Sequence, residues 1–228
     1  MTTPLVLCVD CAAPVVGLSI GPADGLGPLW ARWSARVSRG ADGLLAPELE
    51  AQLALAARRG GALQRVAVTI GPGTFTGLRV GLATALGVAV ALDLPVVPLC
   101  SLAARAAMVE GGGAVLALLD ARKGRFYGAY FEGPDARLQL AEPRDAELAE
   151  LLPAGPFVAV GEGAVVVADR LRAAGGRLAP DADAPPLEAM ARLAAHLPGI
   201  DAALVELAYI RPPDAQVPRH LPTAGGAR

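Results

Sequence analysis

Histidine, cysteine and aromatic residues are scarce in this chain of 228 residues, which has two His, three Cys and 4% Phe, Trp and Tyr. A metal centre of imidazole and thiolate ligands needs several such residues at close spacing. His196 and His220 form no H-x-x-x-H or H-E-x-x-H pair, and the G-x-S-x-G turn of many serine hydrolases is absent. We therefore expect no metal site and no hydrolase centre, which also excludes a free-standing metal-dependent glycoprotease.

The cysteines favour a reducing compartment, and the distribution of apolar and charged residues gives no sign of a membrane segment. Cys8 and Cys11 form a C-x-x-C pair, but the first falls in a strand-like run and two further ligands are missing, so we interpret both as buried. No basic segment precedes the first apolar run, which Asp10 interrupts, and no uncharged apolar run reaches eighteen residues. We expect a cytoplasmic protein. Its net charge of −2 provides no general attraction for RNA.

The most informative segment is the run GPGTFTGLR at positions 71–79, which follows a short apolar run at 66–70. This pattern predicts a strand, a tight turn and the start of a helix. Gly71 and Gly73 allow backbone angles that side chains forbid, and Thr74 or Thr76 can cap the first helical turn. Such a turn could hold an anion, but the Lys of a P-loop is absent. A phosphate cradle and a purely structural turn both remain open.

The helix that follows, from Gly77 to Asp93, has no polar face. Its only charges are Arg79 and Asp93, at its two ends. Small residues recur every four positions, and leucines repeat on the neighbouring face. A helix without a polar side should be covered on both faces, either by its own chain or by a partner. The candidate interface residues are Gly77, Leu78, Gly81, Leu82, Ala85, Leu86 and Ala89.

A repeat halfway along the chain indicates two lobes of similar construction. Five apolar residues ending in Asp10 recur as five apolar residues ending in Asp120, and each run precedes a second strand. In nucleotide-cleaving enzymes with two such lobes, carboxylates at these strand ends hold a metal ion or orient water. The alternative function is therefore a small ATPase or kinase of this two-lobed kind that uses Asp10, Asp120 and the turn at 71–77. However, the turn that follows Asp10 lacks glycine.

The remaining pattern predicts alternating strands and helices, typical of an α/β fold. We expect one lobe at 1–102 and a second at 103–211, followed by a disordered tail at 212–228. The last helix of the second lobe could pack back on the first lobe. The expected strands are 5–10, 15–20, 30–37, 66–70, 95–99, 115–120, 125–131 and 157–160. The expected helices are 47–59, 77–93, 101–110, 146–152, 164–174 and 187–196.

Three segments resemble the TsaB (YeaZ-like) family. The most specific is GPGTFTGLRVGLATA at 71–85, and DARKGRFY at 120–127 resembles the family's second-lobe hairpin. Tyr209, Ile210 and Arg211 resemble its C-terminal Y-[LI]-R. The resemblance extends from Leu5 to Arg211 and implies two duplicated actin/Hsp70-like (ASKHA) lobes, each a mixed sheet with flanking helices.

The resemblance also implies a function. TsaB-like proteins are non-catalytic subunits of the machinery that places threonylcarbamoyl on N6 of adenosine 37 in ANN-decoding tRNAs. The implied partners are a TsaD-like catalytic subunit, joined through helices of the first lobe, and a TsaE-like ATPase. ATP and metal would then belong to these partners, and tRNA would be contacted indirectly. An isolated chain would pair with itself as a homodimer. The cleft positions Asp10, Gly71, Gly73, Thr74 and Asp120 would be remnants of a nucleotide site.

Overall fold

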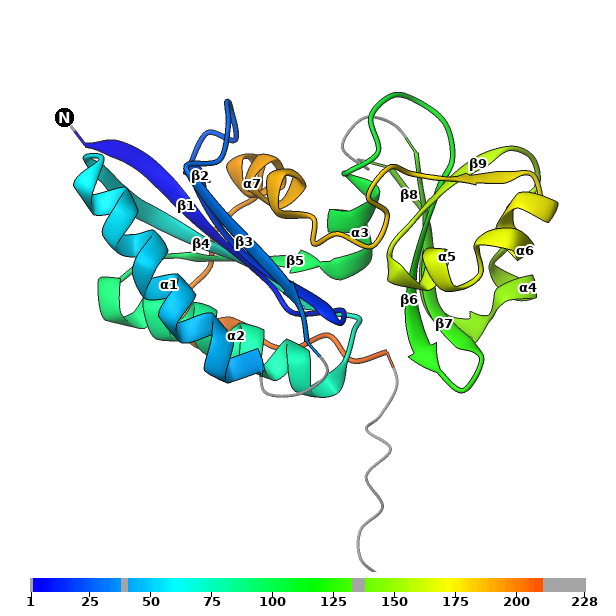
Figure 1. Cartoon of the computed structure of the whole chain (residues 1–228), viewed down its shortest axis with the longest axis horizontal. Coiled ribbons are helices and arrows are strands. Elements are labelled where there is room, and N and C mark those ends of the chain that lie inside the picture. The colour runs from blue at the N-terminus through cyan, green and yellow to red at the C-terminus, as the bar shows by residue number, and fades with distance from the viewer. Residues whose placement is uncertain (1, 38–40, 133–137, 211–228) are drawn as a thin grey trace, which may run out of the picture.

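Two five-stranded mixed sheets form the centres of two lobes (Figure 1). The computed structural model describes residues 2–37, 41–132 and 138–210. The first sheet has the order β3-β2-β1-β4-β5 and the second β10-β9-β6-β7-β8. The strands are β1 (Thr3–Asp10), β2 (Val15–Pro22), β3 (Ala31–Arg36), β4 (Gly61–Gly71), β5 (Val96–Cys100), β6 (Val115–Arg122), β7 (Arg125–Glu132), β8 (Leu138–Glu147), β9 (Phe157–Val160) and β10 (Gly176–Leu178).

The two sheets have the same topology, which confirms the duplication predicted from the repeated strand. In each, the first strand pairs antiparallel with the second and parallel with the fourth. Asp10 and Asp120 take equivalent places, near the ends of β1 and β6, opposite Gly17 and Phe126 respectively. The α/β class and the duplicated actin/Hsp70-like fold are therefore confirmed.

Helices cover both faces of the first sheet (Figure 1). Leu5, Leu7 and Val9 of β1 pack in one core cluster with residues of α1 and α2, whereas Val6 and Cys8 pack on the opposite face with α7. A strand buried on both faces must be apolar throughout, which explains the unbroken run. The helices are α1 (Ala41–Arg58), α2 (Phe75–Leu92), α3 (Ser101–Ala106), α4 (Leu148–Leu151), α5 (Glu162–Val166), α6 (Ala168–Ala173), α7 (Leu187–His196) and the 3₁₀ turn η2 (Ala202–Leu204).

Several helix boundaries differ from the prediction. α1 begins at Ala41 and contains Pro47 in its interior, whereas we expected Pro47 in its first turn. Leu45, in the helical turn before the proline, is buried in the core. The free energy gained by this burial exceeds the cost of the one backbone hydrogen bond that Pro47 cannot donate, so the helix starts before the proline. The helix expected at 101–110 ends at Ala106. The one expected at 164–174 is two short helices meeting at Val167, where three consecutive valines disfavour helix.

The C-terminal part of the described chain returns to the first lobe. α7 contacts β1 and β2, although it follows the second sheet in sequence. Ile200 then bridges to Val96 of β5, and the amide of Ala208 donates to the carbonyl of Ile70 at 2.9 Å. The lobe boundaries at 102 and 211 stay predictions. The expected disordered tail at 212–228, with His220, lies outside the described residues.

Candidate functional site

The turn between β4 and α2 packs directly against two other segments. The amide of Thr74, the N-cap residue of α2, donates a 2.9 Å hydrogen bond to the carbonyl oxygen of Ala12, but its hydroxyl makes no capping bond. A Cβ atom on Gly73 would lie 2.5 Å from the same oxygen, and one on Gly71 would overlap the carbonyl of Ala208. Gly71 also has a φ of 136°, which L side chains rarely adopt. These glycines therefore allow close backbone packing, and the Thr74 amide is already bonded within the chain.

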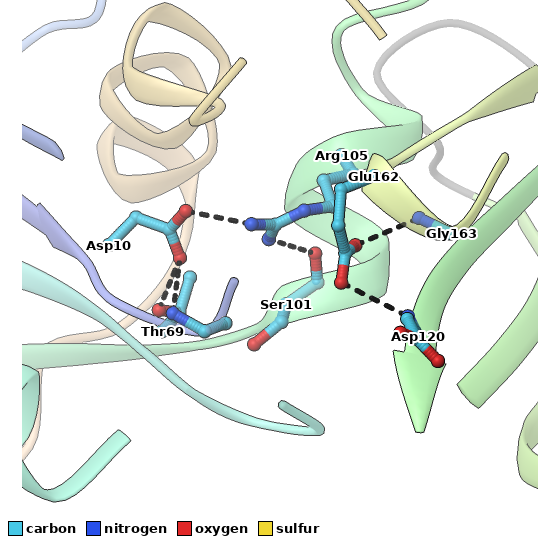
Figure 2. Close-up of polar contacts among 8 residues, drawn as sticks. Asp10, Thr69, Ser101, Arg105, Asp120, Glu162 and Gly163 are labelled. Atoms are coloured by element: carbon cyan, nitrogen blue, oxygen red, sulfur yellow. Dashed lines mark hydrogen bonds and ion pairs between the residues drawn. The ribbon is translucent and has the colours of Figure 1, made fainter. Parts of the chain in front are cut away.

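Asp10 is fully buried, and both of its carboxylate oxygens have partners (Figure 2). Oδ1 accepts from the hydroxyl of Thr69 at 2.7 Å and from the amide of Ala12 at 3.3 Å. Oδ2 forms an ion pair of 2.9 Å with Arg105 of α3, whose side chain is only 1% exposed. The carboxylate that an actin-like ATPase would need is therefore already neutralised by the chain's own guanidinium.

Glu162 belongs to the second lobe, where it starts α5, and it lies beside Arg105 (Figure 2). Its two oxygens accept from the amides of Asp120 and Gly163, each at 3.0 Å. Burial raises the pKa of Glu162, and the Arg105 guanidinium and both amide hydrogen bonds oppose that increase. The carboxylate of Asp120 is engaged in its own hairpin, where Oδ1 accepts from the amide of Arg122 at 2.8 Å. The equivalent aspartates of the two lobes therefore have different surroundings.

The small-residue stripe of α2 faces the chain's own core. Leu78, Gly81, Ala85 and Ala89 are all buried. A Cβ atom on Gly81 would lie 3.0 Å from Cβ of Cys11, and one on Gly77 would overlap the Cys11 carbonyl. The expectation that this stripe contacts a partner helix is therefore wrong, because the close approach that it permits is to the turn after β1. Leu82 and Leu86, also expected at the interface, are half-buried and pack at the edge of the same core.

The solvent side of α2 is also apolar over its C-terminal half. Val90 is 71% exposed, and Ala83, Gly87 and Ala91 are exposed beside it at helical spacing. Leu92, the last residue of the helix, is 53% exposed but lies on another side, two positions after Val90. α1 runs beside α2 (Figure 1). By length and composition alone α2 could cross a membrane, with a mean hydropathy of 1.7 over 18 residues. These residues include Arg79, so the uncharged apolar run within them is shorter than eighteen residues, as expected. Core helices of soluble proteins pass the same test, and one side of α2 packs on the first sheet.

Comparison with known proteins decides the family. Residues 37–168, more than half of the chain, match the model of the TsaD family, tRNA N6-adenosine threonylcarbamoyltransferase. The chain belongs to this family. Within it the chain is TsaB-like, as the motif at 71–85 indicated.

The similarity of this TsaB-like chain to individual proteins supports the same family. An uncharacterised protein of Mycobacterium tuberculosis is 37% identical over 126 residues, which cover 55% of this chain and 58% of that protein. The tRNA threonylcarbamoyladenosine biosynthesis protein TsaB of Escherichia coli is 36% identical over 81 residues, 34% of this chain and 35% of TsaB. The chain thus matches less than two thirds of the length of these relatives. YeaZ from Pseudomonas aeruginosa has the same fold, with a TM-score of 0.71 at 20% identity over 92% of this chain and 100% of YeaZ.

Sequence reasoning found Asp10 and Asp120 but missed three residues around them, Thr69, Arg105 and Glu162. One signal was available, because Arg105 is the only charge in the apolar segment 102–108 and so required an acidic partner. A second signal was the Gly-Glu-Gly run at 161–163, which follows β9 as the turn at 71–77 follows β4. The partners themselves lie too far away in sequence to be read from a local pattern.

Metal ligands do not gather in the part of the TsaB-like chain that the structure describes. Among residues 2–37, 41–132 and 138–210, no group of three or more His, Cys, Asp or Glu could hold a metal ion. Burial raises the pKa of the Cys8 thiol to about 12 and also raises the pKa of Cys11. Both thiols are therefore neutral near pH 7, and our interpretation of the C-x-x-C pair as buried side chains is confirmed.

Proposed function

We propose that this TsaB-like chain is a non-catalytic subunit required for N6-threonylcarbamoylation of adenosine 37 in ANN-decoding tRNAs. It binds and stabilises a TsaD-like catalytic subunit and helps to recruit a TsaE-like ATPase. The match to the TsaD family over residues 37–168 supports the tRNA-modification role. The exposed apolar row on α2 supports a role that depends on a protein partner.

The docking surface in this proposal is the outward row of α2, comprising Ala83, Gly87, Val90 and Ala91, with the adjoining side of α1. Burying a fully exposed Val or Leu side chain contributes about 1.5–3 kcal/mol. Val90, which is 71% exposed, therefore favours association by about 1–2 kcal/mol when a partner covers it. Gly87 has open space above it, which lets another helix approach closely. In the absence of a partner, the same row pairs two copies of the chain.

A non-catalytic role fits the residues at the lobe interface. The ATPase or kinase alternative requires Asp10 to bind a nucleotide-associated cation, yet Asp10 is fully buried and paired with Arg105 at 2.9 Å. ATP and metal are then held by the partner subunits. tRNA is contacted through the assembled complex, consistent with the net charge of −2.

Two valines of nearly equal exposure allow a controlled test. Val90 on α2 is 71% exposed, and Val166 on α5 in the other lobe is 67% exposed. Val90→Arg should abolish co-purification with a TsaD-like subunit and reduce threonylcarbamoyladenosine formation in a reconstituted assay. Val166→Arg adds the same charge elsewhere and should leave both unchanged. Both variants should keep the wild-type melting temperature, because each side chain extends into solvent.

The outcomes separate the two parts of the proposal. If Val90→Arg still co-purifies with the TsaD-like subunit, the docking surface is not on α2. If the wild-type chain neither binds that subunit nor affects tRNA modification, the proposed function is wrong. Micromolar binding of Mg-ATP by the isolated chain in calorimetry would instead support the ATPase alternative.

A further inference from the structure

A single buried guanidinium lies at the seam between the two lobes. Arg105 is 1% exposed, and one of its nitrogens pairs with Oδ2 of Asp10 in the first lobe at 2.9 Å. A second nitrogen donates to the carbonyl oxygen of Ser101 at 3.1 Å. The carboxylate of Glu162, from the second lobe, lies on the opposite side of Arg105 from Asp10 (Figure 2). Arg105 therefore stands between one carboxylate from each lobe.

Without Arg105, the two buried carboxylates of Asp10 and Glu162 would have no compensating positive charge among the contacts described. Asp10 is 0% exposed and Glu162 8%. A buried carboxylate is costly unless a cation or several hydrogen bonds compensate it. The other groups that face this cluster are Asp120 of β6, which faces Glu162, and the thiol of Cys100, just before α3. Within the described residues, Arg105 forms an ion pair with Asp10, and its charge also lowers the pKa of Glu162.

We propose that Arg105 is an internal cation that joins the two lobes by compensating Asp10 in the first and Glu162 in the second. The guanidinium donates to Asp10 and to the carbonyl of Ser101, and it acts on the Glu162 carboxylate through its charge, since the hydrogen bonds to Glu162 come from two backbone amides. Asp10 also accepts from Ala12, and the carbonyl of Ala12 accepts from Thr74 at the start of α2. Hydrogen bonds therefore connect this buried ion pair to the turn that begins α2.

Arg105→Gln removes the charge while keeping a polar side chain. Losing one member of a buried pair leaves uncompensated charge, so we expect the melting temperature to fall by about 10 °C near neutral pH. The deficit should shrink as the pH is lowered, because burial raises the pKa of Glu162 and the guanidinium no longer opposes that increase, so that protonation removes the uncompensated charge. Arg36→Gln is the matched control, because the 2.6 Å pair of Arg36 with Asp183 is solvent-exposed. That control should change the melting temperature by no more than about 2 °C.

A double variant separates charge compensation from simple packing. In Asp10→Asn with Arg105→Gln, the amide keeps Oδ1 as acceptor for Thr69 and Ala12 while both charges are removed. We expect this variant to regain at least half of the melting temperature lost in Arg105→Gln, and to be measurable even if the single variant does not fold. In solution scattering, the radius of gyration should increase in Arg105→Gln and remain at the wild-type value in Arg36→Gln.

Three results would each overturn the proposal. The first is a melting-temperature loss in Arg105→Gln that does not change with pH. The second is a double variant no more stable than the single one, which would mean that Arg105 contributes through packing alone. The third is an unchanged radius of gyration in a folded Arg105→Gln protein, which would show that the ion pair stabilises its immediate surroundings without holding the two lobes together.

Discussion

Two glycines in α2 allow the packing of this helix to be tested with one kind of substitution. A Cβ atom on Gly77 would overlap the carbonyl oxygen of Cys11 and Oγ1 of Thr74. A Cβ atom on Gly87, ten residues further along the same helix, would meet no atom within 4 Å. Gly77→Ala and Gly87→Ala therefore add the same methyl group to the same helix in two different surroundings.

The magnitudes follow from helix propensity and steric overlap. Replacing a helical glycine with alanine favours the helix by about 1 kcal/mol when nothing else changes. Gly87→Ala should therefore raise the free energy of unfolding by about 1 kcal/mol. At Gly77 the same gain is opposed by a backbone shift that costs about 1–3 kcal/mol or more, since the overlapping atom is a backbone oxygen that cannot move away freely. Because the propensity gain is common to both variants, we expect Gly77→Ala to be less stable than Gly87→Ala by about 1–3 kcal/mol.

Thermal unfolding of the two purified variants measures this difference. For a chain of this size, it corresponds to roughly 5 °C between the two melting temperatures, with the wild type between them. Gly81→Ala should be intermediate, because its nearest atoms are 3.0 and 3.3 Å away on the Cys11 side chain. Equal stability of the Gly77 and Gly87 variants would refute the inward orientation of the small-residue stripe.

Two further predictions concern groups packed around the same helix. Cys8 and Cys11 should not react with a thiol reagent at about pH 8 until the chain is unfolded, because burial raises the pKa of both thiols. Rapid labelling of native Cys11, followed by mass spectrometry, would contradict the close packing of α2 on the turn after β1. Tyr209→Ala should cost about 1 kcal/mol, because it removes a ring stack with Phe75 at 5.4 Å and a 3.1 Å hydrogen bond from Arg79. Amide exchange at Ala208, which bonds to Ile70, should then accelerate, and an unchanged rate would argue against this anchoring role.

Some features could be predicted because they are local or repeated. The duplicated sheet was visible as two apolar runs, each ending in Asp, since a first strand buried on both faces has no polar positions. α7 was predicted with its observed bounds, Leu187–His196, because its apolar residues follow a clear helical period behind Pro186. The run at 71–85 was specific enough to indicate the TsaB-like family. By contrast, the start of α1 was missed because burial of Leu45, a tertiary contact, outweighs the local effect of Pro47.

The sequence by itself determined the class of fold, the duplication and the family, because these depend on hydrophobic spacing and on a short motif that any one segment displays. Only the tertiary structure decided which side of α2 is left for solvent. The four-residue spacing of glycine and alanine specifies a smooth face on the helix but does not specify which residue packs against it. In the structure, Cys11 packs against this face. The tertiary structure likewise brought Arg105 to Asp10, 95 positions away in the chain. A buried charge must find its partner in space, and no local pattern records which residue that is.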